Sequence, residues 1–383
     1  MAKLKDICEI IMGQSPDSNS YNEKQDGLPF YQGNADFGEV TPNTRYWCNK
    51  PTKLATENDV LLSVRAPIGA VNIATERCCI GRGLASIREI KDTSFYKYLY
   101  YLVISKNKKL NSLGTGSTFK AINKSNLENI EVTLPSIPEQ QRIAAELDAV
   151  CGVLAKQKKQ YQLLNELVKS KFNEMFGAPE QNERGWAQKL FSAAYEIIDG
   201  DRGVNYPKQN EFSEIGHCLF LNAGNVTKVG FRFEQTQFIT EAKDNALRKG
   251  KLKKYDLVLT TRGTVGNLAY YDDSVPYEHV RINSGMVILR KKTDILPQYF
   301  MVLFSHEAVY KKFISGTAQP QMPIGSMSKV LISIPPLTLQ SKFADFVNQV
   351  EQSKAKLKSE ITQTETLYKA LMQKYFEDKG GQE

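Results

Sequence analysis

The sequence predicts an α+β protein, with two mixed α/β units joined by two long antiparallel coiled-coil helices as an internal repeat with a pseudo-two-fold axis. Two observations predict this class. A proline-containing segment at 134–138 opens a helix-like stretch that runs to Phe176, and the same arrangement recurs from 334 to Phe376. The strand-like segments before each stretch also recur in the same order, so each unit consists of a globular part and one helix.

The repeat can be followed through most of the chain. Residues 9–11 recur at 196–198, residues 59–69 align with 256–266, and residues 83–88 align with 285–290. The offset drifts from 186 near the start through 197 to 202 and is 200 in the helices, as expected when loops gain residues and packed elements do not. We therefore predict a first globular domain over 1–134, a first spacer helix over 135–177, a second domain over 178–334 and a second spacer helix over 335–380.

Both helices are predicted from their start signals and their periodicity. Ser136 and Glu139 have the spacing of an N-terminal capping box, with Pro138 in the first turn. Apolar residues then follow a heptad spacing in each helix. They are Leu147, Val150, Leu154, Tyr161, Leu164, Val168 and Met175 in the first helix and Val347, Val350, Leu357, Ile361, Tyr368, Leu371 and Tyr375 in the second. About 40 residues at 1.5 Å per residue make each helix ~60 Å long, more than one compact domain covers.

Polar residues within the two heptad stripes favour antiparallel pairing. A parallel pair in register sets Gln157 against Leu357, which leaves a polar group against an apolar one. An antiparallel pair centred on Tyr161 sets Gln157 against Thr364 instead. The alternative is that each stripe packs on its own globular domain. The antiparallel pair predicts two heads at opposite ends of a two-helix spacer.

The composition limits the classes of protein to which this chain can belong. The chain has 383 residues, of which 41% are hydrophobic, so it can bury two cores. It has no apolar stretch near the ~20 residues that a membrane-spanning helix needs, and residues 1–6 lack the apolar region of a signal peptide. We therefore expect a cytoplasmic protein with no membrane partner. Six cysteines show no C-x-x-C spacing and only three histidines are present, so we expect no metal site and no cofactor in this chain.

The net charge of +8 makes a polyanion the natural partner, although a solvated basic surface of this size is almost as common. Double-stranded DNA has a local two-fold axis, so two related heads on one chain can contact two separated sites. The loops of the two heads differ: residues 13–16 read Gly-Gln-Ser-Pro, whereas residues 200–203 read Gly-Asp-Arg-Gly. Divergent loops on a common framework predict a bipartite, asymmetric target.

Three segments resemble the specificity subunit of type I restriction-modification systems, namely 13–16, 61–69 and 134–141, the last of which opens the first long helix. The resemblance covers nearly the whole chain, including the duplication. It implies two target recognition domains separated by two helical regions that pack antiparallel. It also implies assembly with two adenine methyltransferase subunits, and with restriction and translocase subunits in the full complex. The second copy departs from the first at 338–339, where Thr-Leu replaces Pro-Glu.

The sequence lacks the motifs of the corresponding chemistry. It contains no N-P-P-[FYW] run for a flipped adenine and no G-x-x-x-x-G-K-[ST] phosphate loop, for which residues 114–120 are the nearest candidate. No histidine has a persuasive Ser or Cys partner in its sequence context. We therefore expect no catalytic residue, and a non-catalytic subunit that directs methylation and restriction by its partners.

Candidate DNA-contacting residues are arginines beside repeated strands and polar residues of glycine-flanked loops. Arg65 and Arg262 keep their place in both copies, which suits phosphate contacts that position a protein without specifying sequence. Arg82 and Arg281 flank the next glycine-bearing strand. The other candidates, some of which can bind adenine or guanine bidentately, are Gln14, Ser15, Asn34, Ser117, Thr118 and Lys120 in the first head and Arg202, Asn222, Asn225, Gln319 and Gln321 in the second. The alternatives are internal salt bridges for the arginines and loop capping or solvent exposure for the others.

Two further functional classes fit the sequence. A free-standing duplicated DNA-binding regulator needs no methyltransferase, and a coiled-coil interaction scaffold carries its basic charge incidentally. Neighbouring genes separate the first from a restriction-modification subunit, and DNA binding with and without a methyltransferase tests the second.

Overall fold

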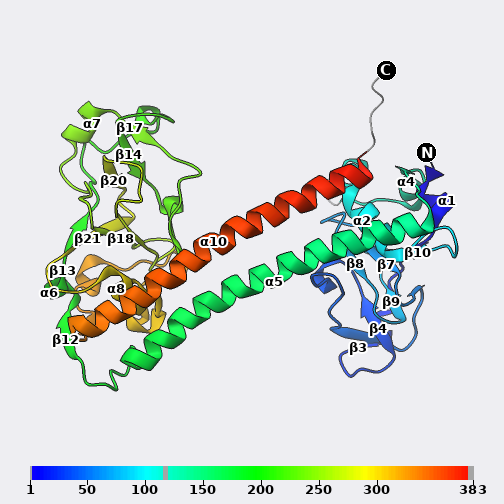
Figure 1. Ribbon diagram of the computed structural model, residues 1–383, viewed down its shortest axis with the longest axis horizontal. Helices are drawn as coiled ribbons and strands as arrows, with labels where there is room; N and C mark the ends of the chain where they lie inside the picture. Colours follow the sequence, from blue (N-terminus) through cyan, green and yellow to red (C-terminus); the bar gives the residue numbers. More distant parts are fainter. Residues whose placement is uncertain (1, 115–119, 378–383) are drawn as a thin grey trace. The chain divides into compact units, whose positions relative to one another are not determined.

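The computed structural model describes residues 2–114 and 120–377, and the chain forms two compact units. Unit 1 comprises Met1–Lys159 and Lys358–Glu383, and unit 2 comprises Gln160–Leu357. The division runs through both long helices, α5 (Ile137–Phe176) and α10 (Leu337–Phe376) (Figure 1). Each unit therefore contains one globular head, half of α5 and half of α10.

The head of unit 1 is built on a four-stranded antiparallel sheet of order β2-β10-β7-β8. Its strands are β2 (Cys8–Met12), β10 (Leu84–Glu89), β7 (Val60–Ser63) and β8 (Val71–Ile73). A second sheet has the order β3-β5-β4-β9-β6, from β3 (Tyr21–Asn22), β5 (Tyr46–Cys48), β4 (Leu28–Tyr31), β9 (Cys78–Ile80) and β6 (Leu54–Ala55). A two-stranded pair joins β1 (Ala2–Lys3) to β11 (Glu131–Val132).

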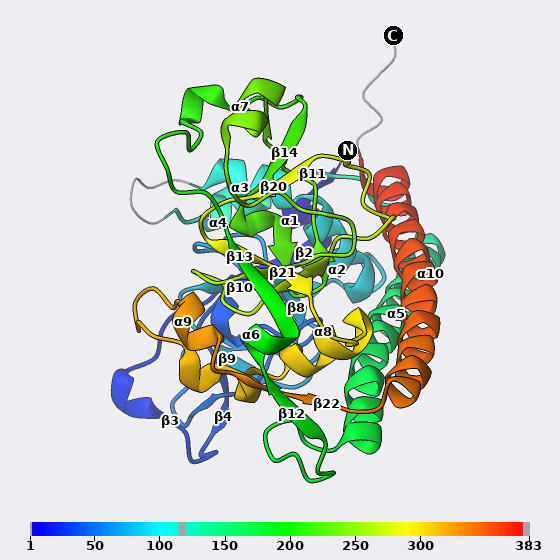
Figure 2. The same cartoon turned by 90° about the vertical axis from the view of Figure 1, so that its left-hand side faces the viewer.

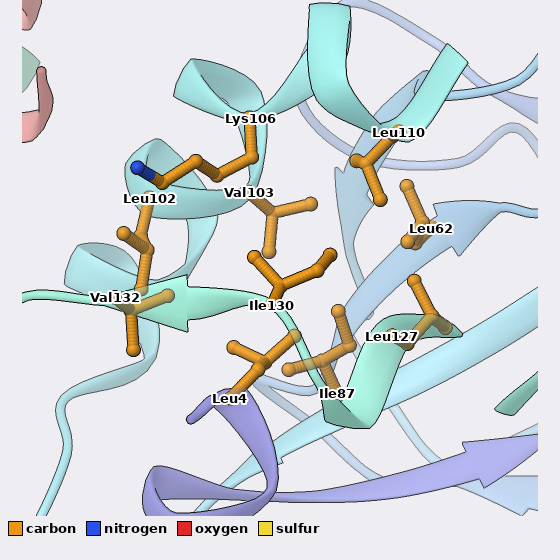
Figure 3. Close-up of a pocket in the computed structure, with 10 residues that line it drawn as sticks. All are labelled: Leu4, Leu62, Ile87, Leu102, Val103, Lys106, Leu110, Leu127, Ile130 and Val132. Carbon is orange, nitrogen blue, oxygen red and sulfur yellow. The ribbon is translucent and has the colours of Figure 1, made fainter. Parts of the chain in front are cut away.

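Helices and short 3-10 turns complete this head. They are α1 (Leu4–Ile7), α2 (Tyr96–Ser105), α3 (Asn107–Leu113), α4 (Lys124–Glu128), η1 (Ser18–Ser20) and η2 (Asn34–Asp36). Helix α2 packs between the four-stranded sheet and the long helices, so that one core contains Tyr98, Leu62 and Leu147. The core is close-packed, because the small pocket in Figure 3 has a volume of only about 10 Å³ and is lined mostly by aliphatic side chains. Lys106 borders this pocket through its stem, and its Nζ donates to the main-chain oxygen of Phe376 at the end of α10.

The head of unit 2 repeats this plan. Its four-stranded sheet has the order β13-β21-β18-β19, from β13 (Tyr195–Asp199), β21 (Met286–Lys291), β18 (Leu257–Thr260) and β19 (Leu268–Tyr270). The smaller sheets are β17 (Phe238–Ile239), β14 (Cys218–Leu221) and β20 (Val280–Ile282); β12 (Ala187–Leu190) and β22 (Leu331–Ile334); and β15 (Val226–Thr227) and β16 (Gly230–Phe231). The helices are α6 (Phe191–Ala194), α7 (Glu241–Ala246), α8 (Pro297–Ser305) and α9 (Ile324–Met327), with 3-10 turns η3 (Gln209–Glu211), η4 (Ala223–Asn225), η5 (Glu307–Val309) and η6 (Lys311–Phe313).

Strand register confirms the predicted fold class and its internal repeat. Met12 pairs with Ala85 in the first head, and Asp199 pairs with Val287 in the second. The parallel pair β4 and β9 likewise corresponds to β14 and β20. The heads differ at the edges of the smaller sheets: beside β14 the sheet ends with β17, whereas beside β4 it continues through β5 to β3. The shared framework is therefore the four-stranded sheet and the parallel pair.

Antiparallel packing of the two long helices is also confirmed, within each unit. In unit 1 the hydroxyl of Tyr375, near the end of α10, donates to Glu146, near the start of α5, at 2.7 Å. In unit 2 the ring of Phe172, near the end of α5, lies 5.5 Å from that of Phe343, near the start of α10. Both views show the helices side by side in each unit (Figures 1 and 2). Each apolar stripe packs both on the other long helix and on a head. The alternative, in which a stripe packs on a globular domain, therefore occurs together with the helix pairing in one core.

The predicted capping box does not hold the start of α5. The carboxylate of Glu139 accepts hydrogen bonds from Arg142 Nε at 2.8 Å and Nη2 at 2.7 Å, in place of the Ser136 amide. An arginine one turn along the helix offers two charged donors, which a carboxylate binds more strongly than one amide. Among the helices that the structure describes, none combines the length and the apolarity needed to cross a membrane.

Candidate nucleic-acid interface

Arg65 and Arg262 occupy equivalent loops in the two heads. Each lies two residues after the end of a buried central strand, β7 or β18, and each side chain is exposed. Arg65 forms an isolated antiparallel bridge with Ala121, and Arg262 forms the same bridge with Gln321. No ion pair involves either guanidinium among the described residues. The two arginines are therefore charged groups on a shared framework, directed to solvent.

Each arginine loop is fixed by a buried hydroxyl at the end of its strand. Ser63 Oγ lies 3.0 Å from the main-chain oxygen of Arg65 and 2.9 Å from that of Pro67. In the second head, Thr260 Oγ1 donates to the main-chain oxygen of Thr264 and accepts from Asn267 N at 3.0 Å. A hydroxyl can both donate and accept a hydrogen bond, so one buried side chain can bond to more than one main-chain group of the turn. The backbone that carries each arginine is held by the fold.

A glycine closes each of these loops. Gly69 has φ +94° and Gly266 has φ +99°, in the region that favours glycine. A Cβ at Gly69 would lie 2.6 Å from Asn107 Nδ2, and one at Gly266 would lie 2.0 Å from the Tyr310 hydroxyl oxygen. The backbone conformation thus favours glycine at both positions, and a Cβ would displace the side chain of Asn107 in the first head and of Tyr310 in the second.

In the second head, the fold brings three of the predicted residues to one pocket. Arg202, Arg262 and Gln321 line a cavity of about 280 Å³ together with Asp199 and Thr261. Arg202 Nη2 donates to Asp199 at 3.1 Å and to the main-chain oxygen of Ser284 at 3.3 Å, which fixes the guanidinium at the pocket wall. The pocket thus offers to a polyanionic partner the guanidinium of Arg262, the amide of Gln321, and the guanidinium of Arg202, which is paired with the carboxylate of Asp199.

The first head has different side chains at the corresponding positions. Strand register places Met12 where the second head has Asp199, and the bridges place Ala121 where it has Gln321. Ser15 corresponds to Arg202, two residues after the repeated glycine. Only the arginine, Arg65 or Arg262, is common to both. The heads therefore share one cation and differ in the groups around it.

The remaining first-head candidates lie in separate places. Gln14 and Ser15 are exposed after β2, Arg82 is exposed between β9 and β10, and Lys120 is exposed beside Ala121. Asn34 opens η2 and is half-buried. Ser117 and Thr118 lie outside the described residues.

Two second-head candidates serve the loop in which they lie. Asn225 is buried, and its Nδ2 donates to the main-chain oxygens of Arg232 at 3.0 Å and Gln235 at 2.8 Å. Asn222 Oδ1 accepts from Gly224 N at 2.8 Å. For these two asparagines, the loop-capping alternative describes the structure. Gln319 is exposed in the loop before Gln321.

Arg281 is buried and lies in the middle of β20, whereas Arg82 lies in a loop, so the two arginines are not equivalent. Arg281 Nε pairs with the carboxylate of Asp244, Nη1 donates to Lys249 O at 2.7 Å, and Nη2 donates to the main-chain oxygens of Asp244 at 2.7 Å and Leu247 at 3.1 Å. Only 5% of Arg281 is exposed. In this structure the internal salt bridge accounts for Arg281, because its donors are used inside the head.

Asp244 receives a second cation from Lys251. Burial by itself raises the pKa of a carboxyl, but hydrogen bonds from Lys251 and Arg281 outweigh it and lower the pKa of Asp244 below its ordinary value. This ion-paired cluster joins α7 to β20 and was missed from the sequence, because nothing local marks Asp244 as the partner of a residue so far along the chain.

The cysteines and histidines show no arrangement of a metal centre. No group of three or more His, Cys, Asp or Glu side chains that could hold a metal occurs within residues 2–114 and 120–377. Burial raises the pKa of the Cys8, Cys78 and Cys218 thiols to about 12, so these thiols are protonated near neutral pH. The rings of His217 and His279 stack with centroids 4.2 Å apart.

Comparison with known proteins gives consistent matches to one family. The family model for the type I restriction modification DNA specificity domain matches residues 1–166 and again residues 196–364. A specificity subunit of a type I restriction enzyme of Methanocaldococcus jannaschii, MjaX, is 42% identical over 165 residues, which are 43% of this chain and 39% of that protein. The match thus spans less than half of that relative.

Two other matches extend over almost the whole chain. The MjaIX type I restriction enzyme specificity subunit of the same organism is 27% identical over 379 residues, covering 90% of this chain and 85% of that protein. The crystal structure of the S subunit of a type I restriction-modification system from M. genitalium has a TM-score of 0.62 at 16% identity and covers 98% of this chain and 95% of that one. The structural match shows a shared fold.

Proposed function

Because the chain belongs to the type I restriction modification DNA specificity family, we propose that its two heads each read one half of a bipartite, asymmetric target in double-stranded DNA. The chain is a specificity subunit, the non-catalytic component that directs methylation and restriction. Family membership thus favours this function over a free-standing regulator or a scaffold. The observation that carries the proposal is the pair Arg65 and Arg262, exposed on equivalent, internally fixed loops.

The shared and the divergent groups have different roles in this proposal. Arg65 and Arg262 bind phosphates, because a contact present in both heads positions DNA without specifying sequence. Arg202 and Gln321 contact base edges in the second half-site, where Arg can bind guanine and Gln adenine bidentately. In the first head, Gln14, Ser15 and Lys120 are exposed in loops beside the same framework and contact the other half-site.

The proposed protein partners are two adenine methyltransferase subunits, with restriction and translocase subunits in a full complex. The long helices support this part of the proposal, because they expose apolar side chains that a partner could cover. These residues are Val153, Leu163, Leu167 and Leu367, which are 46–50% exposed. The chain itself needs no cofactor in this scheme, and the complex acts in the cytoplasm.

Binding of duplex DNA by the complex of this chain with its methyltransferase tests the proposal. Each of Arg65→Ala and Arg262→Ala should weaken binding to every sequence and reduce the slope of log K against log salt by about 0.9, the value for one lost phosphate contact. Arg184→Ala, which removes an exposed arginine in the turn after α5, is the matched control. An unchanged salt slope in both loop variants would contradict the assignment of these arginines to phosphates.

A further inference from the structure

Gln140, in the first turn of α5, is fully buried and makes three hydrogen bonds. Its Nε2 donates to the main-chain oxygens of Pro135 at 2.9 Å and Thr93 at 3.0 Å, and its Oε1 accepts from Phe95 N at 2.9 Å. Thr93 and Phe95 belong to the segment that leads from β10 into α2. One amide group therefore joins the start of the long helix to the head of the same unit.

Gln340 makes the same connection in unit 2, at an offset of 200 residues. It is also fully buried, its Nε2 donates to Pro335 O at 2.9 Å and Asp294 O at 3.4 Å, and its Oε1 accepts from Leu296 N at 2.9 Å. The residues around it differ from those of the first copy, since Thr-Leu at 338–339 stands for Pro-Glu at 138–139. The buried amide and its three partners are therefore common to both junctions although the helix starts have diverged.

The end of the other long helix reaches each junction through an equivalent tyrosine. In unit 1, Tyr98 packs on Phe376 with ring centroids 5.3 Å apart, and its hydroxyl donates to Thr133 O at 2.9 Å. In unit 2, Tyr299 packs on Phe176 with centroids 4.8 Å apart, and its hydroxyl donates to Ser333 O at 2.9 Å. Each head is thus attached to the start of one long helix and to the end of the other.

An attachment at two points resists rotation of a head on its helices, and a small rotation is enough to matter. A residue roughly 15 Å from a hinge, about the radius of gyration of a domain of this size, moves by one base-pair step of ~3.4 Å when the hinge rotates by about 13°. A buried amide with three backbone partners is directional, so it selects one angle, whereas apolar packing by itself tolerates several.

We propose that Gln140 and Gln340 are positioning residues that fix each head on the helix pair and so set the gap between the two half-sites. The inference rests on the proposed function, since a gap exists only if both heads read DNA. The two glutamines contact only main-chain groups of the protein in these hydrogen bonds, and they determine the angle of each head on the helix pair. Recognition of the bases belongs to the loops.

The experiment compares Gln140→Met and Gln340→Met with Gln141→Met in the complex with the methyltransferase. Methionine keeps the volume of the side chain and removes the three hydrogen bonds, and Gln141 is the exposed glutamine that follows Gln140. Methyl transfer is measured on duplexes with the native gap, with the gap one base pair longer or shorter, and with one base changed in either half-site. The target of the wild-type complex is first identified by sequencing methylated adenines.

In Gln140→Met and in Gln340→Met, the ratio of the rate on the native gap to the rate on an altered gap should fall about tenfold. This is the effect of losing the equivalent of one net hydrogen bond. Discrimination against a changed base should stay at the wild-type value. Gln141→Met should leave both unchanged. A merely structural role lowers the rates on all duplexes together and leaves the gap ratio unchanged, which overturns the proposal.

If the methionine variant does not fold, the gap ratio is measured with Gln140→Asn instead. Asparagine keeps an amide, but its shorter side chain cannot reach all three partners. An unchanged gap ratio in Gln140→Asn with a normal rate on the native duplex also overturns the proposal. A wild-type complex that shows no preference for a bipartite target refutes the proposed function itself, and the inference with it.

Discussion

Lys158 and Glu365 form an ion pair between the two long helices, with Nζ 2.9 Å from Oε1. Lys158 lies in the second third of α5 and Glu365 in the last third of α10, and their contact agrees with the antiparallel register of the two helices in unit 1. Both side chains are about half exposed, and an exposed pair contributes little to stability. The apolar stripes beside it carry the stability, and this leads to the first prediction.

Replacing Leu164 with Asp should destabilise the purified chain by about 2 kcal/mol, because Leu164 is partly buried against the core of unit 2 and the carboxylate has no partner there. Leu163→Asp is the matched control, since Leu163 is 48% exposed and its replacement should change stability by about 0.5 kcal/mol or less. Equilibrium unfolding in urea measures both. Equal losses in the two variants would show that the stripe does not face the core as described.

The chain alone should neither transfer methyl groups nor cleave DNA, because the sequence contains no motif for the flipped base or for phosphate chemistry. Purified chain is incubated with duplex DNA and a labelled methyl donor, and the complex with the methyltransferase is the positive control. Methyl transfer by the chain itself, above the level without protein, would refute this prediction.

Replacing Arg202 or Gln321 with Ala should relax specificity in one half-site only. The loss of a bidentate base contact reduces discrimination at one position by about 1–3 kcal/mol, and the rest of the target should be read as before. Ser15→Ala, at the corresponding position of the first head, should leave the half-site read by the second head intact. Methylation of a library of duplexes measures the change at every position. Relaxation spread over both halves would contradict the assignment.

Exchanging one head for that of a relative should rewrite one half of the target. Residues 1–134 and 178–334 are predicted to be separate modules, because the helix repeat is constant at 200 residues while the loops differ. The other half-site and the gap should be retained in the swapped protein. Sequencing of methylated adenines decides the matter, and a single-head exchange that alters both half-sites would mean that the heads do not read DNA separately.

Asp244→Asn should destabilise the second head by about 3 kcal/mol at neutral pH, because it leaves Arg281 buried without its counter-ion. The pKa of Asp244 is lowered in the folded state, so its contribution to stability is complete well above the ordinary value of 3.8 and is lost as pH falls through the lower folded pKa. The difference between wild type and variant should therefore shrink in acid.

Urea unfolding at pH 7 and in the acid range below 3.8 measures this dependence, with Glu214→Gln, an exposed carboxyl, as the control. A difference between wild type and Asp244→Asn that is the same at both pH values would show that the ion-paired cluster does not stabilise the head.

The repeat, the two long helices and their antiparallel direction could be predicted from the sequence, because they depend on periodic patterns. A heptad stripe is visible in any stretch of a few turns, and a polar residue such as Gln157 restricts the partner that a stripe accepts. The repeated strand with Arg65 and Gly69 was predictable for the same reason, since its copy at Arg262 and Gly266 marks what both heads need.

What the sequence could not provide is which polar residues meet. Arg202, Arg262 and Gln321 line one pocket only because three separate segments converge beside β18, whereas Arg281 is removed from the surface by Asp244. Gln140 and Gln340 read as ordinary polar residues of two helix starts. Their burial and their three partners exist only after each helix docks on its head, because a hydrogen bond between distant segments depends on a geometry that no local pattern encodes.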